Sequence, residues 1–228
     1  MPLNPRRSVS PNPRELFAPP PAGRLYAIVD VEVCAAAGRA PLDVAGAFLN
    51  AGVRWLQLRC KTLSSGAFLD LANAMQGDAG AAGASVVIND RADIAALCGA
   101  AGLHVGQTDL AAADARAVIG AAAILGLSTH SRAQWDAALA EPISYLAIGP
   151  AFATATKRTG YEPIGLHMVK LASTAATACG VPVVAIGGIT LENARSVIDA
   201  GAASVAVISD LLNGDPETRC RAFLRALE

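Results

Sequence analysis

Three polar side chains occupy alternate positions within the segment WLQLRCK: Gln57, Arg59 and Lys61. In an extended strand, alternate side chains point to the same side, so these three share one side and the intervening leucines share the other. Buried cations are costly unless they meet an anion. The pattern is typical of an anion-binding strand, because guanidinium and ammonium groups both bind phosphate well. A buried ion-pair network with Asp30 or Asp90 would satisfy the same cations.

Two aspartates each follow a short apolar run: Asp90 follows SVVIN and Asp109 follows GLHV. If these runs are neighbouring strands, the two carboxylates converge although they are far apart along the chain. Converging carboxylates suit Mg²⁺, which prefers a few protein oxygens, some waters and a substrate phosphate. Either residue alone could be a helix cap or a salt-bridge partner. The nearby cations favour the metal site, because a diphosphate held by Lys and Arg commonly needs a divalent ion between its oxygens.

A third group of residues follows the apolar runs PVVAIG and SVAVIS. Gly187 ends the first run and Gly188 follows it, and Ser209 comes at the end of the second. Loops after the last two strands of many barrels bind phosphate through backbone N–H groups, and glycine lets the backbone come close. A tight strand-to-helix turn would explain the paired glycines equally well. The placement of the two groups after the last two runs therefore favours a phosphate site.

The segment GPAFATATKRTGYEPIG is longer than a typical connection between a strand and a helix. A long loop at a strand end is often a lid or a binding loop, and Lys157 with Thr154 and Thr156 could close over an anion. A flexible surface loop is the alternative.

Other catalytic patterns are not supported by the sequence. His104 lies within an apolar run and is typical of a core residue with satisfied hydrogen bonds, and no histidine has a metal-like spacing. No Ser-His-Asp or Cys-His arrangement can be read. By alternation Cys60 points the same way as the leucines of its strand. The five cysteines contain no CxxC pair, which argues against a zinc site or a disulfide framework and favours a reducing cytoplasm.

The elements that must position these residues repeat one pattern, in which a β-branched apolar run precedes an Ala-rich segment with helical spacing. Eight such runs occur: LYAIVD, WLQLRCK, SVVIND, GLHV, ILGLS, YLAIGP, PVVAIG and SVAVIS. Apolar strands that alternate with helices indicate a parallel sheet covered by helices. We therefore predict an α/β fold, a (β/α)8 TIM barrel, with a doubly wound open sheet as the alternative.

The barrel makes a further prediction, because active sites of TIM barrels lie where the strands end. Polar and glycine residues do gather at those ends: Asp30, Gln57, Arg59, Lys61, Asn89, Asp90, Gln107, Asp109, Ser128, Thr154, Thr156, Lys157, Gly187, Gly188 and Ser209. We expect one catalytic domain over residues 23–228. Residues 1–22 are rich in proline and lack an apolar signal core, so we expect a disordered leader.

Composition limits the possible partners. The chain has 228 residues, 53% of them hydrophobic and 16% charged, with a net charge of −1. This balance offers no basic surface for nucleic acid or an anionic membrane, and no apolar run approaches the roughly 20 residues of a membrane span. We expect a soluble, cytoplasmic protein whose partners are small molecules; a homo-oligomer is left open.

Seven segments, in order, resemble the hallmarks of the thiamine phosphate synthase family from about Leu25 to the C-terminus. They are QLRCK, VVINDRADIA, GLHVGQTDL, ILGLSTHS, YLAIGPAFATATK, VPVVAIGGIT and ASVAVISDL. The resemblance implies that an aminopyrimidine methyl diphosphate is joined to a thiazole ethyl phosphate, giving thiamine phosphate and diphosphate. It implies a dissociative step in which diphosphate leaves before the thiazole nitrogen attacks.

The resemblance also implies roles for individual residues. Mg²⁺ would be held by Asp90 and Asp109. The residues implied for the pyrimidine diphosphate are Gln57, Arg59, Lys61, Asn89, Ser128 and Lys157, of which Arg59, Lys61, Lys157 and Ser128 would be catalytic. Those implied for the thiazole phosphate are Thr154, Ala155, Thr156, Gly188, Ile208 and Ser209.

Departures from the family pattern are small. Cys60 stands where many relatives have an acidic residue, and Ala153 stands where a proline is common. A thiazole tautomerase of the same barrel family is a close alternative, but it typically lacks the counterparts of Lys61, Asp90 and Asp109, which are present here. A non-catalytic sensor of a phosphorylated metabolite is a further alternative, and it would have no evident need for the two carboxylates.

Overall fold

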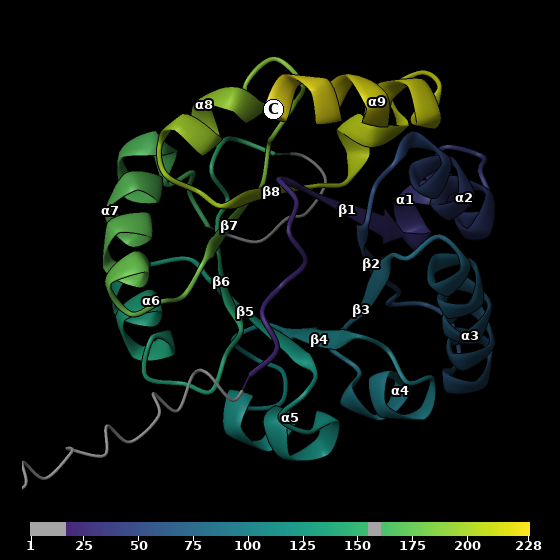
Figure 1. The fold of residues 1–228 in the computed structure, drawn as a ribbon, viewed down its shortest axis with the longest axis horizontal. Coiled ribbons are helices and arrows are strands. Elements are labelled where there is room, and N and C mark those ends of the chain that lie inside the picture. Colours follow the sequence, from purple (N-terminus) through teal and green to yellow (C-terminus); the bar gives the residue numbers. More distant parts are fainter. Residues whose placement is uncertain (1–16, 155–160) are drawn as a thin grey trace, which may run out of the picture.

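The computed structural model describes residues 17–154 and 161–228, which form a closed barrel of eight parallel strands surrounded by helices (Figure 1). The strands are β1 (Leu25–Asp30), β2 (Trp55–Arg59), β3 (Ser85–Asn89), β4 (Gly102–Val105), β5 (Ile124–Thr129), β6 (Tyr145–Ile148), β7 (Val183–Ile186) and β8 (Ser204–Val207). Each strand pairs with the next, and β8 pairs with β1 through Leu25 and Val205. The predicted barrel is confirmed, and the open-sheet alternative is wrong because both edges of the sheet are paired.

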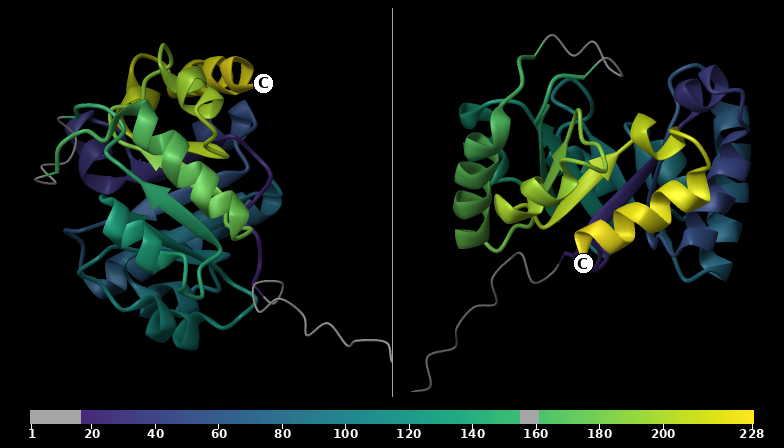
Figure 2. Two further views of the ribbon diagram at one scale, coloured as in Figure 1. Left: turned by 90° about the vertical axis from the view of Figure 1, so that its left-hand side faces the viewer. Right: turned by 90° about the horizontal axis from the view of Figure 1, so that it is seen from above.

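Helices cover the outside of the barrel on all sides (Figure 2). They are α1 (Val31–Ala36), α2 (Pro41–Ala51), α3 (Ser65–Ala81), α4 (Ala92–Leu97), α5 (Ala112–Ile119), α6 (Arg132–Ala138), α7 (Gly165–Ala178), α8 (Ala194–Asp199) and α9 (Pro216–Leu227). A short 3₁₀ helix, η2 (Ser209–Leu212), follows β8. Within the described part of the chain, no helix is both long enough and apolar enough to cross a membrane.

The apolar core has two layers, separated by the barrel wall. Leu56, Leu58 and Cys60 belong to the outer layer, between the strands and the helices. The inner layer fills the barrel and contains Tyr26 and Trp55, whose rings stack 3.9 Å apart. Because side chains of a strand alternate between the two faces, Gln57 points inward with this second group. The predicted alternation along WLQLRCK is confirmed.

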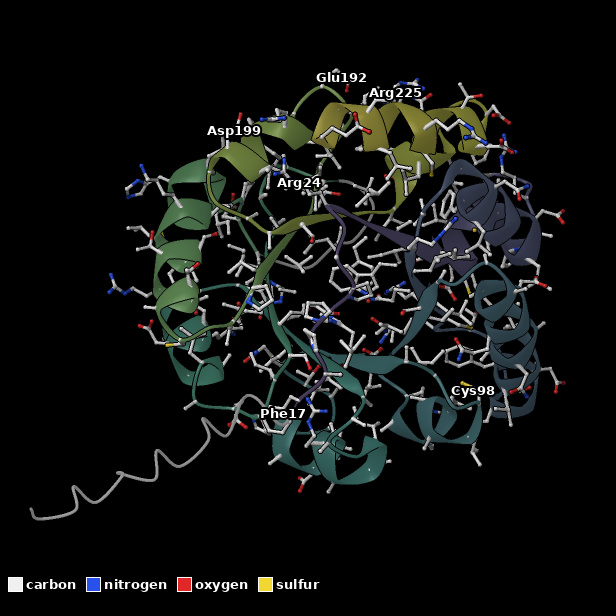
Figure 3. The ribbon with its side chains drawn as sticks, in the orientation of Figure 1. Phe17, Arg24, Cys98, Glu192, Asp199 and Arg225 are labelled. Carbon is white, nitrogen blue, oxygen red and sulfur yellow. The ribbon has the colours of Figure 1, made fainter. Side chains whose placement is uncertain are left out.

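The segment that leads into β1 contacts the N-terminal end of the barrel. The guanidinium carbon of Arg116 lies 4.5 Å from the centre of the Phe17 ring, beside α5 (Figure 3). Ala18 packs against the inner layer of the core. Residues 17–22, which the composition assigns to the leader, therefore contact the barrel, while the rest of the expected leader, residues 1–16, lies outside the described residues.

Candidate active site

Two cavities open at the C-terminal ends of the strands and share part of their walls. We call the first the carboxylate cavity; it measures about 360 Å³ and is lined by, among others, Gln57, Arg59, Lys61, Asn89, Asp90, Asp109 and Ser128. The second, the glycine cavity, measures about 450 Å³, and its walls include Thr154, Gly187, Gly188, Ile208 and Ser209. Ser128, His130, Ile186 and Ala206 line both cavities. A ligand in one cavity can therefore meet a ligand in the other.

Asp90 and Asp109 come together at the wall of the carboxylate cavity. Asp90 directly follows β3 and has a left-handed conformation, with φ of 63°, and its N–H donates to the carbonyl of His104 at 2.7 Å. Asp109 accepts the N–H of Gly106 at 2.8 Å. Burial and a hydrogen bond with Asp90 both raise the pKa of the Asp109 carboxyl above its ordinary value. The predicted convergence of the two side chains is present in the structure.

A cation would relieve the repulsion between these two carboxylates. Within residues 17–154 and 161–228, no group of three or more His, Cys, Asp or Glu side chains could hold a metal ion. A pair of carboxylates fits Mg²⁺, which keeps several waters and completes its shell with substrate phosphate oxygens, better than it fits zinc.

The cations at the end of β2 and just after it are paired with carboxylates, which is the ion-pair network that the sequence left open. Arg59 Nη1 lies 2.6 Å from Asp30 Oδ2, and the Lys61 ammonium contacts the Asp90 carboxylate. Asp30 is buried and also caps α1 by accepting the N–H of Val33 at 3.1 Å. These pairs do not exclude anion binding, because the Lys61 side chain is half exposed at the cavity.

Glu32, in the first turn of α1, is a neighbour of these cations that the sequence analysis missed. Its carboxylate accepts the backbone N–H of Lys61 at 2.8 Å and the Thr62 hydroxyl at 2.9 Å, and lies 3.4 Å from Arg59 Nη1. Glu32 thereby holds the start of the loop after β2. The sequence does contain a signal for Glu32: it is the second acidic residue of the segment DVE, two positions after Asp30, and so lies close to the same cations.

Gln57 and Ser128 contact a set of aromatic side chains inside the barrel. Gln57 Nε2 donates to the Tyr26 hydroxyl at 2.8 Å, and Ser128 Oγ lies 2.7 Å from His104 Nε2. The other ring nitrogen of His104 lies 2.8 Å from the Tyr145 hydroxyl. The prediction that His104 is a core residue with satisfied hydrogen bonds is confirmed, and its link to Ser128 was not foreseen.

The glycines of the second cavity permit close packing of two loops. Gly187 and Gly188 have φ of 97° and 63°, and a Cβ atom at Gly188 would lie 2.8 Å from the Cβ of Phe152. Tight packing therefore explains these glycines without a ligand. The short helix η2 begins at Ser209, two positions after the last residue of β8, which is where many barrels place a phosphate site. Ala155, Thr156 and Lys157 lie outside the described residues.

His130 stands at the junction of the two cavities, and the sequence analysis gave it no role. Its Nδ1 lies 2.7 Å from the carbonyl oxygen of Gly149, and its ring stacks on Tyr161 with centroids 3.9 Å apart. Because a carbonyl can only accept, the His130 Nδ1 carries a proton.

Residues 25–211 match the family described as thiamine monophosphate synthase. A thiamine-phosphate synthase of Roseiflexus castenholzii is 38% identical over 97% of this chain and 94% of its own length. One from Koribacter versatilis is 42% identical over 90% of this chain and 95% of its own. The fold is similar to that of a thiamine phosphate pyrophosphorylase from Pyrococcus furiosus, with a TM-score of 0.81 and 24% identity over 90% of this chain and 95% of that one.

Proposed function

The chain belongs to the thiamine monophosphate synthase family and is a transferase, and from this premise we propose which parts of the site carry out the reaction. The aminopyrimidine methyl diphosphate binds in the carboxylate cavity and the thiazole ethyl phosphate in the glycine cavity. The bond between the methylene carbon and the diphosphate oxygen breaks, and a bond between that carbon and the thiazole nitrogen forms. Diphosphate and thiamine phosphate are the products.

The observation that carries this proposal is the shared wall of the two cavities. Carboxylates and cations lie in one cavity, whereas glycines and the start of η2 lie in the other. A substrate in each would place the methylene carbon and the thiazole nitrogen on either side of the shared residues Ser128 and His130. Holding two reactants in this way is a large part of catalysis in a bimolecular substitution.

Asp90 and Asp109 would hold Mg²⁺, which when bound stabilises the charge that grows on the departing diphosphate. Lys61 and Arg59 supply positive charge on the same side of the cavity, and Lys157 would add a further cation. Gln57, Asn89 and Ser128 contact the pyrimidine ring. Thr154, Ala155 and Thr156, with Gly188, Ile208 and Ser209, hold the thiazole phosphate.

The direct test is to incubate the purified protein with Mg²⁺ and both phosphorylated halves and to detect thiamine phosphate by the fluorescence of its oxidised form. Product that depends on both halves is expected. Absence of product at high protein concentration would favour the tautomerase alternative, which should then isomerise the thiazole phosphate when that is supplied alone. Tight binding of one half without any conversion would instead favour a sensor.

A further inference from the structure

The loop between β7 and α8 is held by an asparagine that the proposed reaction leaves without a role. We call residues 187–191 the glycine loop, and most of them line the glycine cavity. Asn193, directly before α8, accepts the N–H of Thr190 at 2.8 Å and donates to the carbonyl of Gly188 at 3.0 Å. In a trans peptide the C=O and the N–H point in opposite directions, so the N–H of Ile189 points away from Asn193. Asn193 therefore sets the orientation of a peptide group in the wall of the cavity.

An aspartate in η2 holds the same loop from the neighbouring wall of the cavity. Asp210 Oδ2 accepts the N–H of Leu191 at 3.0 Å and lies 2.7 Å from Arg219 Nη2. The Asp210 and Arg219 side chains are both mostly buried. Asp210 directly follows Ser209, and Leu191 lies three positions after Gly188. The hydrogen bond therefore fixes the distance between the two backbone segments to which the proposed function assigns the thiazole phosphate.

Arg219 reaches Asp210 from α9, which lies beside α8 on the outside of the barrel (Figure 1). Arg219 Nε lies 3.2 Å from Asp210 Oδ2, and Arg219 Nη2 lies 3.4 Å from Glu192 Oε1, directly after the glycine loop. An unpaired carboxylate in the wall of a phosphate site would repel the ligand, whereas a carboxylate paired with a guanidinium adds no net charge. Arg219 therefore allows Asp210 to hold the loop without opposing an anion in the cavity.

We propose that Asp210 and Asn193 are positioning residues that keep the glycine loop in its binding conformation against η2, and that Arg219 offsets the charge of Asp210. A site that is in its binding conformation for only a fraction of the time has a dissociation constant raised by the inverse of that fraction. The two residues thus act on affinity for the thiazole phosphate and not on affinity for the pyrimidine diphosphate. This inference rests on the proposed function, because it assigns the thiazole phosphate to the glycine cavity.

The first test needs no substrate. Asp210→Ala and Asp210→Asn both remove the negative charge beside Arg219, but only the asparagine keeps an oxygen that can accept the Leu191 N–H. Amide hydrogen exchange in the full-length protein, followed by NMR, should be about tenfold faster at Leu191 in Asp210→Ala than in Asp210→Asn, the scale for loss of one hydrogen bond. Equal exchange rates at Leu191 in the two variants would overturn the role of Asp210.

The second test measures affinity. Calorimetric titration gives the dissociation constant for the thiazole ethyl phosphate, and a separate titration with Mg²⁺ gives that for the pyrimidine diphosphate. We expect Asp210→Ala to bind the thiazole phosphate about tenfold more weakly than Asp210→Asn, with equal affinity of the two variants for the pyrimidine diphosphate. Asp199→Ala is the matched control. It removes an exposed carboxylate that pairs with Arg195 at 2.9 Å, at the opposite end of α8 from the glycine loop, and should leave both affinities at the wild-type value.

Asn193→Ala tests the same inference from the other wall, also if Asp210→Ala does not fold. It should weaken binding of the thiazole phosphate by a similar factor and leave binding of the pyrimidine diphosphate unchanged. Equal weakening of both substrates in these variants, or weakening of neither, would overturn the inference. If the wild-type protein binds no thiazole phosphate, the proposed function fails and the selective effect fails with it, whereas the exchange rates still decide whether Asp210 holds the loop.

Discussion

Asp90 shows at the scale of one residue how the site departs from ordinary local structure. Among the described residues it is the only one other than glycine with positive φ. A side chain in this conformation costs on the order of 1 kcal/mol, and such residues cluster at functional sites. Here the conformation brings the Asp90 carboxylate against Asp109, so local stability is lost in favour of the cation site that we propose.

Asp109→Asn should separate stability from activity. The substitution removes one of two abutting charges, so the melting temperature in excess chelator is expected to rise by a few degrees, while turnover falls by orders of magnitude. Asp114→Asn, on the exposed side of α5, is the matched control and should change neither quantity appreciably. Scanning calorimetry with and without Mg²⁺ makes the comparison. Full activity of Asp109→Asn in chelator would contradict the metal role.

At this scale the sequence predicted correctly which side of a strand a side chain faces, because side chains along a strand alternate between its two sides. It placed Gln57, Arg59 and Lys61 on the inner side of the segment WLQLRCK and Cys60 on the outer side. It favoured a bound anion over a protein carboxylate as the partner of Arg59, whereas the structure pairs Arg59 with Asp30, because alternation gives the side of a strand and says nothing about what lies opposite. Glu32 was missed for the same reason.

At the scale of elements, Glu32 ties the first turn of α1 to the loop after β2. Glu32→Ala removes the acceptor of the Lys61 N–H and the Thr62 hydroxyl. We expect KM for the pyrimidine diphosphate to rise about tenfold with a smaller change in kcat, since the loop that carries Lys61 loses its anchor. Steady-state kinetics decides the matter, and Glu32→Gln, which keeps an acceptor oxygen, should recover most of the loss. A fall in kcat at constant KM would show a different role.

The packing of α1 and α9 on the barrel predicts which thiols react. Burial raises the pKa of Cys34, on α1, to about 11 and that of Cys220, on α9, to about 12, so at pH 8 each is almost entirely the unreactive thiol. Cys179 is exposed at the end of α7. Mass spectrometry after brief alkylation at pH 8 should find Cys179 modified well before the other two. Equal labelling would mean that α1 and α9 open in the native state.

The elements themselves were largely predictable, because each strand is a short apolar run with turn residues on both sides. The helices α1 and η2 were not predicted, since both are short and lie directly after strands. Closure of the sheet through β1 and β8 depends on the full set of strands. The regular repetition of strand and helix in the sequence therefore favoured a closed barrel over an open sheet but did not establish it.

At the scale of the whole molecule, the barrel separates stability from chemistry. Both cavities lie at the C-terminal ends of the strands, while Arg116 joins the loops that precede β5 and β6 at the opposite end. Its guanidinium donates to the carbonyls of Pro142 at 2.9 Å and Gly120 at 3.0 Å, and burial lowers its pKa. Phe17 covers one face of this buried cation.

Phe17→Ala should therefore lower stability and spare activity. Loss of the ring removes a cation–π contact and exposes Arg116 to water, for a decrease of about 1 kcal/mol in the free energy of unfolding. Phe17→Tyr keeps the ring and serves as the control, and deletion of residues 1–16 leaves every described contact in place. Urea denaturation measures the stability, and initial rates at 25 °C measure the activity. The rate should stay unchanged, because the substitution lies at the far end of the barrel from both cavities. A reduced rate in a folded Phe17→Ala protein would show that the two ends of the barrel are coupled, and would contradict the separation of stability from chemistry.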